Sequence, residues 1–398
     1  MAPLDGRPEP DTASRARRTA ALGALALAAF AFVAFHGAGG ATRDDTFLNA
    51  QTSRLRPLDD RDDPPADARP PPAAPPPPPA AAAPPRDGEP RAKPPHVVFF
   101  LADDVGFDDV GYNGDPTLTN RVSTPVIDAL ADAGVKLSRY YTQPDCTPSR
   151  AALLSGKYPA TTGTYHGVLN PQSAWGLPLE HVLLPEALPG AYRSHAVGKW
   201  HVGHSSAKRL PESRGFDSFL GFYGAMIDYS THEIHDHDLA CAGDACAAAL
   251  ADCQVRGSTV ADFSGLGGGR RDYDGMYATD VFADRAVDVI EAEAADHPLF
   301  LYVAFNAVHG PLEADEADVA AFEAAFLPES DSTRATFAAV ALAMDRAIGR
   351  VVDALKATGA YENALVVFAS DNGAIPGQAG GGSNWPLRGG KFSAWERG

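Results

Sequence analysis

The stretch Val97-Val98-Phe99-Phe100-Leu101 decides the fold class of this 398-residue chain. Its apolar residues run without alternation, which is typical of a strand buried on both faces of a parallel sheet. We expect three further strands, at residues 194–197, 299–305 and 365–368. Helical patterns are expected at residues 124–134, about 276–295 and about 333–358. Strands that alternate with helices predict an α/β fold, with a mixed, mostly parallel sheet between helices.

Polar residues follow each expected strand at the point where its apolar run ends. Asp103 and Asp104 come after the first strand, and residues 198–201, 306–311 and 370–373 come after the others. In open α/β sheets, ligands bind beyond the carboxyl ends of the strands. We therefore expect one site at this edge of the sheet. Asp103 and Asp104 are adjacent like charges, and a shared cation would relieve their repulsion.

A single cysteine lies in the run Pro144-Asp145-Cys146-Thr147-Pro148-Ser149-Arg150. The run has the pattern Cys-x-Pro-x-Arg, and a small, apolar, helix-forming segment follows it. We expect a helix that begins just after Cys146 and directs its positive end at the site, where it favours anions. An isolated cysteine would be read as a buried structural thiol, but several residues in one pattern favour a functional one.

Four more stretches stand in the order typical of one enzyme family: Leu-Ala-Asp-Asp-Val-Gly at 101–106, Val-Gly-Lys-Trp-His at 197–201, Arg-Gly-Phe-Asp at 214–217 and Asn-Trp-Pro-Leu-Arg-Gly-Gly-Lys at 384–391. With the cysteine run, they make the chain from about residue 95 resemble the type I, formylglycine-dependent sulfatases, in particular the arylsulfatase B group. The resemblance implies an alkaline-phosphatase-like sulfatase fold. It also implies a smaller C-terminal subdomain, which is missing from this sequence.

The resemblance implies two cofactors. One is a formylglycine derived from Cys146, whose hydrated aldehyde attacks sulfur in the family's reaction. The other is one Ca²⁺ per chain, held by Asp103, Asp104, Asp371, Asn372 and the formylglycine at position 146. All of these are oxygen donors, as a hard cation requires.

The resemblance also assigns roles in catalysis. Arg150 matches the residue that fixes the formylglycine hydroxyl group. Lys199, His309 and Lys391 match the groups that hold the sulfate and the leaving oxygen. His201 matches the histidine that hydrogen-bonds the gem-diol and helps to eliminate sulfate. Cations of this kind suit an anionic ester, whose charge must be neutralised before attack.

The function implied is that of a sulfuric ester hydrolase, an arylsulfatase-like enzyme that removes sulfate from a sulfated sugar or polysaccharide. An N-acetylhexosamine 4-sulfate is the substrate suggested by the resemblance. A formylglycine-dependent phosphodiesterase or phosphonate hydrolase of the same superfamily is one alternative, which Lys391 and residues 384–391 disfavour. A catalytically inactive, membrane-tethered binding protein is another, which the complete set of catalytic residues disfavours.

The N-terminal 95 residues of the chain predict a tether. The apolar run 20–35 predicts a signal-anchor at residues 19–41. Residues 1–18 are expected to be a short cytosolic tail, because they carry three arginines just before that run. Residues 42–95 read as a disordered, Pro-rich stalk, and residues 96–398 as the catalytic domain.

The tether predicts the location of the protein. We expect a single-pass type II membrane protein of the Golgi or cell surface, or a secreted protein if the segment is cleaved. The secretory pathway would also supply the formylglycine-generating enzyme as a partner. The net charge of −18 argues against nucleic acid as a partner. Three other cysteines, Cys241, Cys246 and Cys253, allow at most one bridge among themselves; the Cys241–Cys253 spacing resembles a family disulfide.

Overall fold

The computed structural model describes residues 93–114, 121–165, 167–171, 173–232, 264–265, 268–269, 273, 275–326, 332–375 and 380–395. The tail and anchor, nearly all of the stalk, and Cys241, Cys246 and Cys253 lie outside these residues. No helix in the described part of the chain is both long and apolar enough to cross a membrane.

A sheet lies at the centre of the described residues, with its strands in the order β5-β4-β3-β2-β6-β1-β7. The strands are β1 (His96–Ala102), β2 (Arg193–Lys199), β3 (Ser218–Phe222), β4 (Ser264–Gly265), β5 (Gly268–Gly269), β6 (Leu299–Ala304) and β7 (Ala364–Ser370). Strands β3, β2, β6, β1 and β7 are parallel, and the short strands β4 and β5 extend one edge in antiparallel pairing. The predicted mixed, mostly parallel sheet is confirmed. The sequence analysis had not identified β3, β4 or β5.

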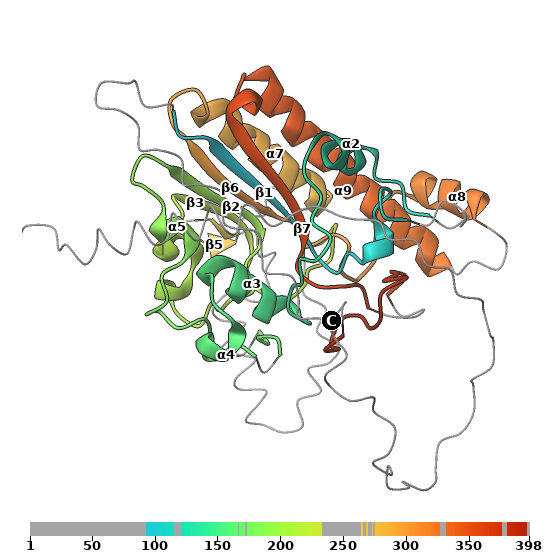
Figure 1. Ribbon diagram of the computed structural model, residues 1–398, viewed down its shortest axis with the longest axis horizontal. Helices are drawn as coiled ribbons and strands as arrows, with labels where there is room; N and C mark the ends of the chain where they lie inside the picture. The colour runs from blue at the N-terminus through green and yellow to red at the C-terminus, as the bar shows by residue number, and fades with distance from the viewer. Residues whose placement is uncertain are drawn as a thin grey trace, which may run out of the picture. The chain divides into compact units, whose positions relative to one another are not determined.

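Helices cover both faces of the sheet (Figure 1). They are α2 (Pro125–Ala133), α3 (Cys146–Ser155), α4 (Pro159–Thr162), α5 (Leu184–Ala187), α7 (Ala278–Glu293), α8 (Glu316–Ala325) and α9 (Ser332–Ala357), with 3-10 turns η2 (Phe107–Asp109), η3 (Ala207–Arg209), η4 (Pro211–Arg214) and η5 (Tyr361–Asn363). Helices α2, α7 and α9 lie on one face, and α3, α4 and α5 on the other. This two-sided cover confirms the α/β class.

Strand β1 shows why the apolar run was informative. Val98 and Phe100 belong to the hydrophobic core beneath α7 and α9, whereas Val97 and Leu101 belong to the core beneath α3. Successive side chains of a strand point to opposite faces, so a strand covered on both sides needs apolar residues at every position. This placement brings the end of β1, where Asp103 follows, to the middle of the site edge.

Carboxylates cap the starts of two helices, and one of these starts differs from the sequence prediction. Helix α3 begins at Cys146 itself, because Asp145 is its N-cap and accepts a hydrogen bond from the Cys146 backbone N–H. Helix α2 begins at Pro125 as expected, but Thr124 makes no side-chain cap there. The carboxylate of Asp345 on α9 accepts the free N–H groups of the first turn instead, at 3.0 and 2.8 Å.

Candidate active site

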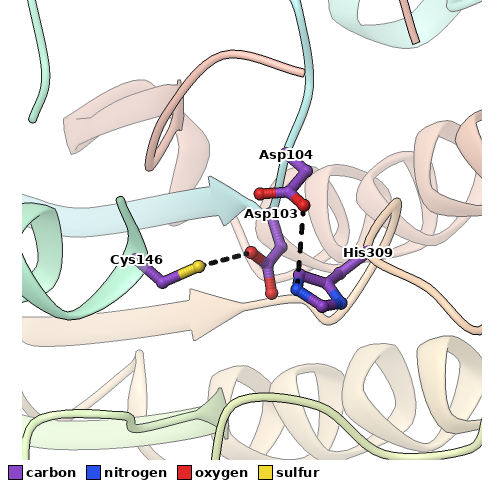
Figure 2. A group of neighbouring side chains, drawn as sticks. All are labelled: Asp103, Asp104, Cys146 and His309. Carbon is purple, nitrogen blue, oxygen red and sulfur yellow. Dashed lines mark hydrogen bonds and ion pairs between the residues drawn. The ribbon is translucent and has the colours of Figure 1, made fainter. Parts of the chain in front are cut away.

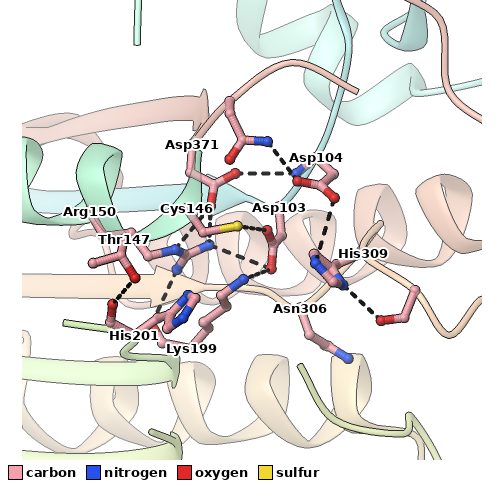
Figure 3. A network of polar contacts seen from close by, with 12 residues as sticks. Asp103, Asp104, Cys146, Thr147, Arg150, Lys199, His201, Asn306, His309 and Asp371 are labelled. Atoms are coloured by element: carbon pink, nitrogen blue, oxygen red, sulfur yellow. Dashed lines mark hydrogen bonds and ion pairs between the residues drawn. The ribbon is translucent and has the colours of Figure 1, made fainter. Parts of the chain in front are cut away.

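The predicted site residues come together at the carboxyl edge of the sheet (Figure 3). Four strands, the start of helix α3 and the C-terminal segment deliver them: Asp103 and Asp104 after β1, Lys199 and His201 at the end of β2, His309 after β6, Asp371 and Asn372 after β7, Cys146 and Arg150 on α3, and Lys391. All of them are buried except His309, which is half-buried.

Cys146 occupies the first position of α3, facing the acidic residues that follow β1. Its Sγ lies 3.7 Å from Asp103 Oδ1. Burial raises the pKa of the thiol well above its usual value, although Lys199 opposes this shift. Because the thiolate is the nucleophilic form of cysteine, the unmodified side chain would be a poor nucleophile here.

A group of potential metal ligands surrounds the end of β1 (Figure 2). Asp103, Asp104, Cys146 and His309 each offer a ligand atom, and these atoms lie within 4.8 Å of one another. Asp371 adjoins the group, since its Oδ1 accepts a hydrogen bond from the Asp104 backbone N–H at 3.2 Å. The acidic residues predicted from the sequence as metal ligands are therefore neighbours.

Asn372 provides a test of whether this group suits a metal ion. Its Nδ2 donates to Asp104 Oδ1 at 2.6 Å, but its buried Oδ1 has no hydrogen-bond partner among the described residues. A buried polar atom without a partner costs free energy unless something else satisfies it. An amide oxygen beside carboxylates fits the donor set of a hard divalent cation. The residues present thus fit a metal ion at this position.

Arg150 is fully buried beneath the carboxylates. Its Nε and one terminal nitrogen donate to Asp371 Oδ2 at 3.0 and 2.8 Å, and the same terminal nitrogen lies 3.7 Å from Asp103 Oδ2. The other terminal nitrogen donates to the Lys199 carbonyl at 3.3 Å. Burial alone would lower the pKa of this guanidinium, but Asp371 and Asp103 raise it, so it stays charged.

Two lysines complete the charge balance. Lys199 Nζ lies 2.5 Å from Asp103 Oδ2, and Lys391 Nζ lies 2.8 Å from Asp104 Oδ1. Burial opposes the charge on Lys391, but the carboxylates of Asp104 and Asp103 raise its pKa. Burial likewise raises the pKa of Asp103, and Lys199 then lowers it below the usual value. Each buried charge is thereby paired, as burial requires.

The two histidines have defined hydrogen bonds that indicate their tautomers. His201 Nε2 is 3.0 Å from the Leu169 carbonyl, and His309 Nδ1 is 2.8 Å from the Gly310 carbonyl. A carbonyl only accepts, so these nitrogens carry the proton in the neutral rings. Burial and then Lys199 hold the pKa of His201 well below its usual value. His201 is therefore neutral, with Nδ1 as an acceptor that has no partner among the described residues.

A second group of buried residues, which the sequence analysis did not identify, supports the segment that carries Lys391. Asp109 accepts hydrogen bonds from the backbone N–H of Ser383 at 3.0 and 2.8 Å, and from Arg334 on α9. Arg334 also donates to the Gly381 carbonyl at 2.9 Å. We call Asp109, Arg334 and Ser383 the clasp. Asp109 lies 225 and 274 positions before Arg334 and Ser383, so no local pattern reveals the clasp.

Further hydrogen bonds hold the segments that carry Lys391 and His309. The amide of Asn384 pairs with the backbone N–H and carbonyl of Ala374, both at 2.9 Å. The backbone N–H of Lys391 donates to the same carbonyl at 3.0 Å. On the other side, the Tyr229 hydroxyl group donates to the carbonyls of Asn306 and His309 at 3.1 and 3.0 Å. These contacts fix where Lys391 and His309 stand.

The α/β sheet with its charged site at the carboxyl edge has the fold of a sulfatase of known structure, PsFucS1, which is 27% identical with a TM-score of 0.59. The sulfatase family model matches residues 95–398, and the chain belongs to the sulfatase family. This confirms the family expected from the sequence. The narrower assignment to the arylsulfatase B group stays a prediction.

Three known proteins illustrate the similarity. Mouse arylsulfatase J is 39% identical over 306 residues, covering 76% of this chain and 46% of that protein. Human arylsulfatase A is 34% identical over 319 residues, covering 77% of this chain and 58% of that protein. The crystal structure of Ps i-CgsB in complex with k-i-k-neocarrahexaose is 32% identical with a TM-score of 0.64, covering 77% and 64% of the two chains. The chain thus spans about half the length of the curated relatives.

Proposed function

We propose that this protein hydrolyses sulfate esters at the site around Cys146. One observation carries the proposal. Three cationic side chains, Arg150, Lys199 and Lys391, form ion pairs with buried carboxylates. These carboxylates lie beside the cysteine of the Cys-x-Pro-x-Arg pattern. Preorganised cations in a site that excludes water stabilise a reacting anion strongly. Membership of the sulfatase family supports the same reaction.

The lysines are suited to hold the ester. Lys199 and Lys391 reach the site from different segments and bond to Asp103 and Asp104. Arg150 instead bonds mainly to Asp371. An ammonium group has three rotatable donors, so each lysine can bond a sulfate oxygen from its present position. Arg150 would keep the residue at position 146 oriented.

The histidines can move the protons. Neutral His201 has an acceptor at Nδ1 that no described residue occupies, which suits the removal of a proton from a neighbouring hydroxyl group. His309 Nε2 lies 3.7 Å from Asp104 Oδ2, and in its protonated form it can give a proton to a leaving alcohol. Lys391 could serve as the acid instead. His201 would thus accept a proton, and His309 or Lys391 would donate one.

We further propose one Ca²⁺ as the metal, held by Asp103, Asp104, Asp371, Asn372 and the residue at position 146. When bound, this ion and a formylglycine made from Cys146 would supply charge neutralisation and an oxygen nucleophile. The donor set supports the metal, and so does the Asn372 Oδ1 atom, which has no hydrogen-bond partner within the described part of the chain. The Cys-x-Pro-x-Arg pattern and the raised pKa of the unmodified thiol support the modification.

The proposed substrate is a sulfated saccharide, such as an N-acetylhexosamine 4-sulfate. A similar protein of known structure is in complex with k-i-k-neocarrahexaose, which supports an oligosaccharide as ligand. Formylglycine is made in the secretory pathway by a generating enzyme. We therefore also propose delivery to that pathway through residues 19–41, as a membrane-anchored or secreted protein.

The experiment uses the full-length protein, coexpressed with a formylglycine-generating enzyme and supplied with calcium. Its rates are compared on the sulfate and the phosphate ester of one aryl alcohol. We expect kcat/KM to favour the sulfate ester. A preference for the phosphate ester would support a phosphodiesterase, and turnover of neither ester, with tight binding of a sulfated saccharide, would support a binding protein.

A further inference from the structure

Phe392, which lies beside the site, is an unusual residue for its position in a β-turn. The Ser393 backbone N–H donates to the Gly390 carbonyl at 3.0 Å, which closes a β-turn with Phe392 at its third position. Phe392 there has a φ of 71°. Turns of this kind favour glycine or asparagine at that position, because a bulky side chain is strained at positive φ.

Packing does not explain the aromatic ring. Phe392 is 66% exposed, so little of the ring is removed from water. The turn is held without the ring, because the Phe392 backbone N–H donates to the Pro144 carbonyl at 2.7 Å, and Ser393 Oγ accepts from the Gly390 N–H at 3.0 Å. A local rule that is broken without a gain in packing is typical of functional positions.

The ring stands next to the catalytic cluster. Lys391 Nζ lies 5.4 Å from the centroid of the Phe392 ring and 2.8 Å from Asp104 Oδ1. The same backbone N–H that fixes Phe392 joins it to residue 144, two positions before Cys146. The strained turn therefore holds an exposed aromatic ring near the proposed leaving-group lysine, on a residue whose backbone is bonded to the segment that leads to the nucleophile.

We propose that Phe392 is a substrate-contacting residue whose ring packs against the apolar face of the sugar that carries the sulfate ester. Aromatic rings bury the C–H faces of flat or cyclic ligands with little loss of conformational entropy. The Phe392 side chain would thus recognise the sugar ring next to the reacting oxygen, whereas the cations would recognise the sulfate group. This inference rests on the proposed sulfatase function.

The test replaces Phe392 in the full-length, formylglycine-containing protein. Phe392→Gly removes the ring and suits the positive φ, and Phe392→Trp keeps an aromatic face. Trp395→Ala is the matched control, because Trp395 is 58% exposed in the same segment and its ring packs on Arg388. The measurements are kcat and KM on a sulfated disaccharide, inhibition by inorganic sulfate, and the melting temperature.

We expect Phe392→Gly to raise KM for the disaccharide about 10-fold or more while kcat changes less, since the interaction lost is one of binding. Inhibition by inorganic sulfate, which has no ring, should stay within about 2-fold. The melting temperature should not fall, and Phe392→Trp should restore KM. An unchanged KM, or an equal rise in Trp395→Ala, would overturn the inference, and so would a lower melting temperature with weaker sulfate inhibition. Failure of the wild-type protein to turn over any sulfate ester would instead overturn the proposed function.

Discussion

The site and the clasp are both buried clusters of acids and cations, but they satisfy their charges in different ways. In the clasp, Asp109 accepts backbone N–H groups from Gly106 and Ser383 together with Arg334, so its oxygens are saturated by fixed donors. In the site, Asp103 and Asp104 are paired with the flexible ends of Lys199 and Lys391. Asn372 Oδ1 has no partner among the described residues.

Because of this difference, the clasp is suited to hold a segment in place, whereas the charged groups of the site are suited to exchange partners. Backbone donors cannot leave without unfolding, so the clasp is suited to fix the segment that carries Lys391. Ammonium groups on long side chains can turn to a new anion when a metal ion takes over the carboxylates. These contacts suit the site to the proposed binding of a cation and an anion together, whereas those of the clasp do not. Variants in the two clusters should fail in correspondingly different ways.

The largest effect is expected from Asp103→Asn in the site. The substitution keeps the shape of the side chain but removes the charge that faces Lys199 and Arg150. We expect kcat/KM for an aryl sulfate to fall by about 100-fold to 1,000-fold, the range seen when one preorganised electrostatic group is lost. Asp109→Asn in the clasp is the control. An equal loss in both variants, at equal stability, would remove the distinction between the clusters.

A clasp variant should mainly change stability. Arg334→Met leaves Asp109 as an unpaired buried carboxylate, whose pKa burial already raises and Arg334 holds down. Removing one partner of a buried pair costs about 3–5 kcal/mol. Urea unfolding should show this loss, and the double variant with Asp109→Asn should recover part of it. A stable single variant with weak activity would place Arg334 in catalysis.

Calcium should stabilise the protein through the site alone. A ligand that binds only the folded state at 100 times its Kd adds about 2.7 kcal/mol to the free energy of unfolding. We expect the melting temperature to rise with added calcium and to fall in excess chelator, together with activity. The rise should vanish in Asp104→Asn and persist in Asp109→Asn. Full activity in excess chelator would contradict the assigned ligands.

The smallest effect concerns Asp345, which caps α2 from α9. Burial raises its pKa to about 6. An unfolded aspartate titrates near 4, so the folded protein binds the proton more tightly, and the contribution of Asp345 to stability falls as pH rises from about 4 to about 6. Relative to Asp345→Asn, the wild type should lose on the order of 1 kcal/mol over this window. A difference that grows with pH would show the opposite sign.

The sequence predicted those features that depend on local patterns and on strand topology. The apolar runs that became β1 and β6 were visible because two-sided burial leaves no polar position in them. Strand ends such as Asp103 and Asp371 meet because β1 and β7 are parallel neighbours. The Asp345 cap and the clasp could not be predicted, since they join residues 218 and 274 positions apart. Strands β4 and β5 are too short to leave a pattern.

The most direct test of the account is the chemical state of residue 146 in an active preparation. Trypsin releases this residue in the peptide 140–150, which lies between Arg139 and Arg150. Mass spectrometry of protein made with the generating enzyme should show an aldehyde in place of the Cys146 thiol, in proportion to sulfatase activity. Cys146→Ser should give an unmodified peptide and no turnover. A fully reduced thiol in a protein that hydrolyses sulfate esters would contradict the central claim.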